Sequence, residues 1–359
     1  MSRYLALDAL RGCTIAVMIL ANTPGSWDYV YAPLLHADWH GCTFMDLGFP
    51  MFLFIVGSAM FFSFRKNDFT CSTPLLLMVL KRGLMLFGIG LLLNSYPFNG
   101  PWQDMRLMGV FQRIAIVYVI GAVVVLTLRK NAIYALCVGI LLAYWGLLVL
   151  AGGDAPFSLQ DNLVRQLDIM LLGEGHLWQG KGLAFDPEGL LSSLPAVVNL
   201  LCGFEVTRYL VSVEDKKDSA INIGVFGVVS VAIGLLWSSQ MPLNKSLWTS
   251  SYALYSAGYA CLALSAAIYI IDIKGFHKLT KPLIEYGSNP LLMYMLSFLC
   301  VASYYNIDIG NISLYQWLFD GLREVFEPTF ASLMFAVGHV VFFWWVSSVL
   351  FRRNIFIKT

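Results

Sequence analysis

The sequence predicts an all-α fold, a polytopic membrane bundle of about ten transmembrane helices. Of the 359 residues, 58% are hydrophobic and only 13% are charged, whereas a soluble domain carries roughly 25% charged residues. Apolar blocks of about 20 residues, the length a helix needs to cross a bilayer, recur along the whole chain. The blocks are too long for barrel strands and do not alternate apolar with polar residues.

Turn residues between the apolar blocks divide the chain into its predicted spans. The first block begins almost at Met1, but Asp8 and Arg11 interrupt it and no convincing cleavage site follows. We therefore interpret it as a helix and not as a signal peptide. The ten spans are 4–22, 44–64, 75–95, 107–128, 131–152, 188–211, 219–240, 250–273, 283–304 and 329–351. Residues 1–359 are predicted to form a single transmembrane domain.

Basic residues predict the orientation, because positively charged loops stay on the cytoplasmic side. Most of them follow even-numbered spans or precede odd-numbered ones, which makes both termini cytoplasmic. The loops on the predicted outer side hold Arg106, Arg165, Lys181, Lys245 and Arg323. Two outer segments, about 23–43 and 153–187, are rich in Asp, Glu, His, Trp and Gly and indicate a functional surface. Segment 312–326 has helical spacing of apolar residues and is expected to lie along the interface.

Charge and cysteine content exclude several classes of protein. A formal net charge of +1 gives no attraction to nucleic acid. The seven cysteines are scattered and form no CxxC pair, so neither a disulfide framework nor a zinc site is indicated. We expect them to be packing residues.

Ionisable residues within the spans are the first functional candidates, because each costs about a few kcal/mol or more in a bilayer. Arg11 and Arg82 fall in the cytoplasmic halves of the first and third spans. Guanidinium groups match phosphate oxygens, so these two could hold an anionic cofactor. An ion pair of Arg11 with Asp8, and snorkelling of Arg82 towards the interface, are the structural alternatives. Gln112 and Arg113 lie near the outer end of the fourth span.

The stretch HADWHGCTFMDLGFP, residues 36–50, gathers titratable groups at the outer start of the second span. His36 and His40 are four residues apart, a spacing that could suit a metal. Asp38 and Asp46 would have to complete such a site, and nothing resembles HExxH, so no metal is expected. Solvated loop histidines are the other alternative.

The second outer segment could form a sugar-binding rim, since aromatic faces pack on pyranose rings and carboxylates hold hydroxyl or ammonium groups. An ordered, solvent-facing loop is the alternative. The candidate residues of this rim are Asp168, Glu174, His176, Trp178, Asp186 and Glu188.

Seven motifs in order resemble the heparan-alpha-glucosaminide N-acetyltransferase family and its bacterial homologues, over nearly the whole chain. They are LDALRGCTIAVMILAN, HADWHGCTFMDLGFPMFLFIVGSAMF, RGLMLFGIGLLLN, MGVFQRIAIVYV, LDIMLLGEGHLW with FDPEGLLSSLPAVV, LNKSLWTSSY and GSNPLLMY. The resemblance implies a transmembrane enzyme that passes acetyl groups from cytoplasmic acetyl-CoA to the free amine of a glucosamine across the membrane. The family's additional lumenal N-terminal domain is not expected here.

The resemblance also assigns roles to residues. The family's active-site histidine, in its His-x-x-Trp-x-Gly motif, falls on His36, and its upstream asparagine falls on Asn22. His40 stands where relatives often have Asn, and the spacing between Asn22 and His36 is a few residues longer than in the family. Residues then expected to contact coenzyme A are Arg11, Arg82, Gln112, Arg113 and Asn289, and those expected to contact the acceptor are Trp39, His40, Trp248 and the rim.

The expected chemistry is acyl transfer with His36 as the base, because imidazole takes up protons near neutral pH. Asn22 would stabilise the oxyanion or orient the ring. Asp46 would fix the His36 tautomer or cap the second span. Direct attack by the amine and transient acetylation of His36 both remain open. We favour the direct route because no second base is obvious.

Two other functions remain alternatives: an amino-sugar transporter, and an O-acyltransferase that modifies a periplasmic glycan. The expected partners are an amino sugar, coenzyme A and the lipid bilayer, and the expected location is a bacterial inner membrane. Aromatic residues facing lipid in the last span suggest a homodimer contact: Phe342, Phe343, Trp344 and Trp345.

Overall fold

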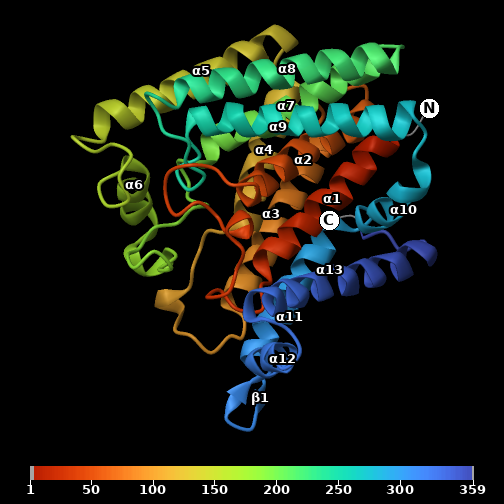
Figure 1. Ribbon diagram of the computed structural model, residues 1–359. Helices are drawn as coiled ribbons and strands as arrows, with labels where there is room; N and C mark the ends of the chain where they lie inside the picture. Colours follow the sequence, from red (N-terminus) through yellow and green to blue (C-terminus); the bar gives the residue numbers. More distant parts are fainter. Residues whose placement is uncertain (1–3, 358–359) are drawn as a thin grey trace.

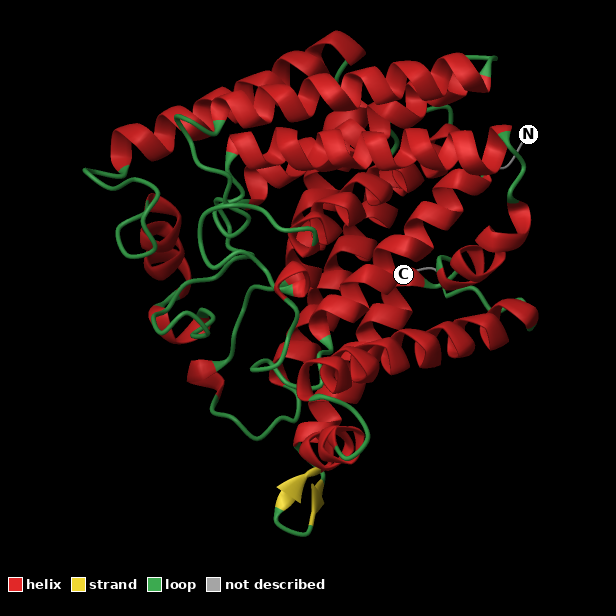
Figure 2. Cartoon of the chain, in the orientation of Figure 1, coloured by secondary structure: helices red, strands yellow, loops and turns green. Residues whose placement is uncertain are grey.

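The computed structural model describes residues 4–357, and in this part the chain is helical apart from one short hairpin (Figures 1 and 2). The prediction of a single domain over residues 1–359 includes residues outside this range, 1–3 and 358–359. It stays a prediction. The helices are α1 (Leu5–Asn22), α2 (Gly48–Arg65), α3 (Thr73–Ser95), α4 (Val110–Thr127), α5 (Lys130–Ala151), α6 (Leu163–Leu172), α7 (Ser193–Ser212), α8 (Lys216–Trp237), α9 (Ser250–Ala267), α10 (His277–Tyr286), α11 (Pro290–Tyr305), α12 (Leu314–Arg323) and α13 (Pro328–Arg352).

Short elements connect the helices. They are the 3-10 turns η1 (Ala32–Leu34), η2 (Met45–Leu47), η3 (Trp102–Asp104) and η4 (Glu174–His176), the π-helical turn η5 (Ile268–Ile273), and strands β1 (Asp308–Ile309) and β2 (Ile312–Ser313). The two strands pair antiparallel.

The polytopic membrane fold is confirmed. Nine helical segments of residues 4–357 are long and apolar enough to cross a membrane, and α11 is a shorter apolar helix in the place of a further predicted span. With 16 residues α11 is about 24 Å long, less than the roughly 30 Å of a hydrocarbon core. The chain is therefore a multi-pass integral membrane protein.

Several predicted boundaries are wrong by a few residues. The fourth span begins at Val110 and not at 107, because Gly109 has extended backbone with φ 165°. The sixth begins at Ser193, since turns occupy the residues before it. The predicted ninth span, 283–304, starts in the last turn of α10, and α11 begins at Pro290, a first position that proline tolerates. The predicted helix 312–326 is confirmed as α12, but 312–313 form strand β2.

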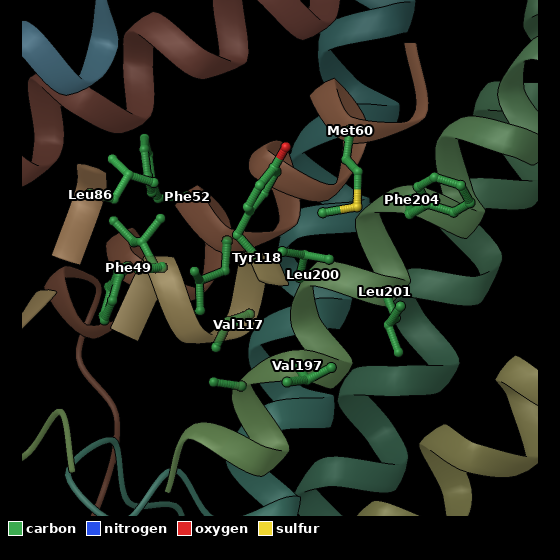
Figure 3. Close-up of a cluster of buried hydrophobic side chains, with 14 of the residues drawn as sticks. Phe49, Phe52, Met60, Leu86, Val117, Tyr118, Val197, Leu200, Leu201 and Phe204 are labelled. Atoms are coloured by element: carbon green, nitrogen blue, oxygen red, sulfur yellow. The ribbon is translucent and has the colours of Figure 1, made fainter. Parts of the chain in front are cut away.

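Helices in the core approach at glycines, which let backbones come into contact in membrane bundles. A Cβ added to Gly57 of α2 would lie 1.9 Å from the Leu200 carbonyl oxygen of α7, and one added to Gly203 would lie 1.9 Å from that of Phe54. Figure 3 shows side chains from α2, α3, α4 and α7 meeting beside this contact, Tyr118 among them. This packed centre fixes the helices that carry the site.

The two ends of the bundle differ in content. Segments 23–47, 96–109, 152–192 and 238–249 gather at one end, here called the loop end, together with α6. The start of α1, α10 and the end of α13 lie at the opposite end, here called the tail end (Figure 1). The Ser26 backbone N–H donates to Ser332 Oγ at 3.1 Å, which holds the first loop to α13.

Only part of the aromatic cluster in α13 is available to a second copy. Phe342 and Trp345 are exposed, whereas Phe343 is buried in the core of the bundle. The homodimer contact stays a prediction that concerns these two exposed rings.

Candidate active site

A cavity of about 530 Å³ opens at the loop end of the bundle. Its polar wall comes from the loops and from the ends of α1 and α2, and its apolar wall from α11. The lining of the polar wall includes Asn22, His36, Trp39, Asp46, Arg106, Trp178, Lys181, Glu188 and Lys245. The lining of the apolar wall includes Tyr294, Phe298 and Val301 of α11.

His36 and Asp46 form a hydrogen-bonded pair in this cavity. His36 Nδ1 lies 2.8 Å from Asp46 Oδ1. The other carboxylate oxygen accepts from the backbone N–H groups of Ala37 and Thr43, at 3.1 and 2.9 Å, and from the Thr43 hydroxyl at 3.1 Å. Asp46 is 1% exposed, so it is a buried acceptor that holds its partner in place. With Nδ1 engaged by Asp46, Nε2 is the ring nitrogen left for a substrate.

Lys245, from the loop before α9, completes the charged group. Its Nζ lies 3.4 Å from Asp46 Oδ1 and 3.2 Å from His36 Nδ1. The Tyr252 hydroxyl of α9 donates to the Asp46 carbonyl oxygen at 2.6 Å. Segments about 200 residues apart in the chain therefore meet at one carboxylate.

Asn22, the last residue of α1, lines the same cavity. Its Nδ2 donates to the Met18 carbonyl oxygen at 2.8 Å. Among residues 4–357 no hydrogen bond joins Asn22 to His36, so the structure places the two on one cavity without direct contact.

Aromatic residues form the side walls next to His36. Trp39 Nε1 donates to the Phe157 carbonyl oxygen at 2.8 Å, and its ring packs edge-on against Phe185 at 5.2 Å. Trp178 lines the cavity with the Arg106 guanidinium 6.0 Å from the centre of its ring. Both predicted rings are thus available to a flat ligand face.

A buried ion cluster supports this wall. Arg106 donates two hydrogen bonds of 2.8 Å to Asp186 and one of 2.6 Å to Glu188. Burial opposes the guanidinium charge, but the bonds and charge of Asp186 and Glu188 outweigh it and raise the pKa of Arg106. Asp186 is fully buried behind the wall, whereas Glu188 reaches the cavity.

Asp168 of the predicted rim does not reach the cavity. It is fully buried in α6, where Oδ1 accepts from the Leu190 N–H at 3.0 Å and Oδ2 packs on Gly189. Burial raises the pKa of Asp168 to about 7 despite this hydrogen bond. Its geometry is that of a residue holding the turn 186–192 and not that of a ligand contact.

The raised pKa of Asp168 predicts a pH-dependent cost to stability. The unfolded chain ionises this group near pH 4, whereas the folded chain keeps the proton up to about pH 7. Stability is therefore lost as the pH rises from about 4 to 7. Asp168→Asn is expected to raise the free energy of unfolding by about 4 kcal/mol at pH 8 and about 1.5 kcal/mol at pH 5.

Thermal unfolding of the detergent-solubilised variant at the two pH values checks this expectation. Asp154→Asn, which changes an exposed carboxylate in the preceding loop, is the control and should leave both values unchanged. An equal gain for Asp168→Asn at pH 5 and pH 8 would contradict it.

Three further predicted contacts lie in the core behind the cavity. Trp248 is fully buried, with its Nε1 donating to Asn199 Oδ1 at 2.9 Å. The Arg113 guanidinium lies 4.9 Å from the Trp248 ring and donates to Ser192 Oγ. Arg113 Nε and Nη1, and both amide atoms of Gln112, are buried without a hydrogen-bond partner among residues 4–357. These side chains do not line the cavity.

The residues expected to hold coenzyme A at the tail end do not form one cluster. Arg11 pairs with Asp8 at 3.3 Å, the alternative that its spacing had suggested. The Arg82 guanidinium lies over the Tyr118 ring at 4.7 Å. Asn289 accepts from the Ile357 N–H at 2.7 Å and donates to the Ile355 carbonyl oxygen at 3.0 Å, so it anchors the C-terminal segment.

Three predicted acceptor contacts face away from the cavity. His40 is exposed, with Nδ1 3.4 Å from Asn244 Nδ2, and partial burial lowers its pKa. His176 Nδ1 lies 2.8 Å from the Met105 carbonyl oxygen and joins two loops. Glu174 is an exposed residue of η4. Within residues 4–357, no group of three or more His, Cys, Asp or Glu side chains is placed to hold a metal ion.

Sequence reasoning missed the cations of this site. Arg106, Lys181 and Lys245 counted only as exceptions to the charge rule for loops, although all three line the cavity. Lys245 lies within the motif LNKSLWTSSY, which was the one signal that could have found it. The apolar wall of α11 gave no signal, because its residues resemble those of any membrane helix.

Comparison with known proteins agrees with this site. The family model described as "Heparan-alpha-glucosaminide N-acetyltransferase, catalytic" matches residues 3–161, which include Asn22, His36 and Asp46. Human heparan-alpha-glucosaminide N-acetyltransferase is 27% identical over 350 residues, covering 82% of this chain and 52% of the human protein. The mouse protein of the same name is 25% identical over 351 residues, covering 82% of this chain and 53% of the mouse protein.

This chain spans about half the length of the curated relatives it matches. The residues matched by the family model, 3–161, include α1 to α5, whereas Lys245 and the α11 wall of the cavity lie outside them. The chain is similar to the heparan-alpha-glucosaminide N-acetyltransferase catalytic family over residues 3–161, and is a distant relative of the human and mouse proteins.

Proposed function

We propose that this protein is a transmembrane N-acetyltransferase that moves the acetyl group of acetyl-CoA to the free amine of a glucosamine-type sugar on the other side of the membrane. The observation that carries the proposal is the 2.8 Å pair of His36 with buried Asp46 on a cavity that Asn22 also lines. The match to the family model supports the reaction class, and the cavity supplies groups that the reaction needs.

His36 acts as the general base in this proposal. Asp46 holds Nδ1 and fixes the tautomer, so Nε2 can take a proton from the attacking nitrogen. The amine forms a bond to the thioester carbonyl carbon, the carbonyl oxygen gains negative charge, and the carbon–sulfur bond then breaks to release the thiolate. Asn22, on the same cavity, would donate to that oxygen once its Nδ2 turns from the Met18 carbonyl.

The cavity offers groups suited to an amino sugar next to a thioester end. Its polar wall offers Trp39 and Trp178 as ring platforms and Glu188 as an acceptor for hydroxyl groups. The apolar α11 wall faces the position of an acyl chain. Arg82, whose Nε is buried without a hydrogen-bond partner among residues 4–357, is the candidate for the cofactor's phosphates, with Arg11 as a further one.

In this proposal the tail end faces the cytoplasm and supplies acetyl-CoA, in accordance with the distribution of basic loops. The loop end faces the acceptor. A bacterial inner membrane is the location we propose, and direct attack by the amine is the proposed route.

Reconstituted vesicles test this function. The purified protein in liposomes should acetylate glucosamine when acetyl-CoA is outside and glucosamine is trapped inside, and should form little product when both are outside only. Methyl glucoside, which lacks the amine, is the matched acceptor control. Release of unmodified glucosamine from the vesicles would indicate a transporter instead, and equal acetylation of methyl glucoside would indicate an O-acyltransferase.

A further inference from the structure

Lys245 places a cation against both members of the His36–Asp46 pair. Its Nζ lies 3.2 Å from His36 Nδ1 and 3.4 Å from Asp46 Oδ1, and its side chain is 22% exposed. The distance to Asp46 is that of an ion pair. The ion pair accounts for the contact of Lys245 with Asp46 but not for its contact with the His36 ring.

The turn that carries Lys245 is held rigidly. Asn244 Oδ1 accepts from the Leu247 N–H at 2.8 Å, and the Asn244 N–H donates to Thr249 Oγ1 at 3.1 Å. The Trp248 backbone has φ 49°, the left-handed region, and its side chain is anchored in the core. The start of α9 thus fixes the backbone of Lys245 beside the His36–Asp46 pair.

The contact with Lys245 disfavours a positive charge on His36. When Nδ1 carries its proton and donates to Asp46, an ammonium group cannot donate to the same nitrogen, so the ring N–H and the ammonium group face each other without a bond. A neutral ring tolerates this arrangement, whereas an imidazolium is repelled. Asp46 by itself would favour the imidazolium, which is useless as a base.

The remaining charges around the cavity do not replace this contact. Arg106 and Glu188 pair with each other at 2.6 Å. Lys181 donates to the Asp38 carbonyl oxygen. Both α1 and α11 line the cavity with uncharged side chains. Among the described residues, Lys245 is the cation in direct contact with His36.

We infer that Lys245 is a positioning residue whose ammonium group balances the charge of Asp46 beside His36, and so disfavours the imidazolium form of the base. The inference rests on the proposed function for its catalytic meaning. Its physical content, the protonation of His36, can be measured without turnover.

The test follows two pH titrations of the full-length protein in detergent. One is the pH dependence of kcat/KM for acetyl transfer to glucosamine. The other is the rate of carbethoxylation of His36 by diethylpyrocarbonate, mapped by peptide mass spectrometry, which reports the neutral imidazole. The variants are Lys245→Met, Lys245→Arg and Asp46→Asn, and the control is Lys181→Met, which removes another cavity lysine that is bonded to Asp38 and not to His36.

Lys245→Met is expected to move both titration midpoints up by about one pH unit, because an opposite charge within about 4–6 Å shifts a titration by 1–3 units when nothing balances it. Below the midpoint, this shift lowers the fraction of His36 that is neutral by about tenfold. Asp46→Asn should move them down, Lys245→Arg should restore the wild-type position, and Lys181→Met should leave the midpoints in place.

The two proposals can fail separately. A wild-type protein without transferase activity would end the proposed function, while the carbethoxylation titration would still test Lys245. Midpoints that stay in place, or move down, in a folded Lys245→Met variant would overturn the role of Lys245 and leave the proposed function intact.

Discussion

Acetyl transfer is expected to fall by about 10²–10⁴-fold when His36 is replaced by alanine, the range that general acid–base catalysis contributes. The loss should appear in kcat, because the imidazole acts on the proton that moves during the reaction. Binding of the sugar by Trp39 and Trp178 should be retained, so KM should change less. Steady-state kinetics of acetylglucosamine formation by the reconstituted protein measure both quantities.

Asp38→Ala is the matched control for His36→Ala, since Asp38 is an exposed residue of the same loop whose backbone oxygen, and not its side chain, contacts Lys181. Its size-exclusion profile and transferase activity should remain near those of the wild type. A His36→Ala variant that keeps full transfer would remove His36 from the mechanism. Acetyl-His36 trapped by rapid quenching would replace direct attack with the covalent route.

The largest loss of stability is expected from Arg106→Met. The substitution leaves the fully buried Asp186 and the neighbouring Glu188 without their cation. Removing one partner of a buried pair costs about 3–5 kcal/mol. Because the Arg106 side chain is 26% exposed, we expect about 2–3 kcal/mol here, after allowing for solvent screening. Thermal unfolding in detergent gives the loss, and the KM for glucosamine should rise because Trp178 loses its support.

Two companion variants separate charge from geometry at this cluster. Arg106→Lys keeps the cation but not the bidentate fork that donates to Asp186, so its stability should be intermediate. Neutralising both acids, with Asp186→Asn and Glu188→Gln, should recover part of the stability lost by Arg106→Met, since no buried charge then lacks a partner. A triple variant no more stable than Arg106→Met would show that the ion pairs are not the source of the loss.

The helices could be predicted because hydropathy is a local property. A run of about 20 apolar residues has few alternatives to a membrane helix, and the nine long helices lie where the sequence placed them. The boundaries failed at Gly109 and Asn289, where a glycine or proline decides the backbone within one or two residues. The pairing of His36 with Asp46 was within reach for the same reason, since only ten residues separate them.

Positions of polar residues relative to the cavity could not be predicted. Asp168 and Glu188 look alike in the sequence, yet one is enclosed between α6 and a turn and the other lines the cavity. The same residue types can form a cavity rim or a buried network, because a carboxylate finds hydrogen-bond donors in either environment. Trp248 and Arg113 are a further example, as the structure places both in the core.

By itself the sequence determined a helical membrane bundle, the family motifs and the local group of His36, Asp46 and Trp39, all of which depend on neighbours along the chain. Only the tertiary structure decided which distant side chains join them. Lys245 reaches His36 across 209 positions, and Arg106 reaches Asp186 across 80. Such contacts depend on how the helices pack, and packing is set by the summed fit of many side chains that no single motif records.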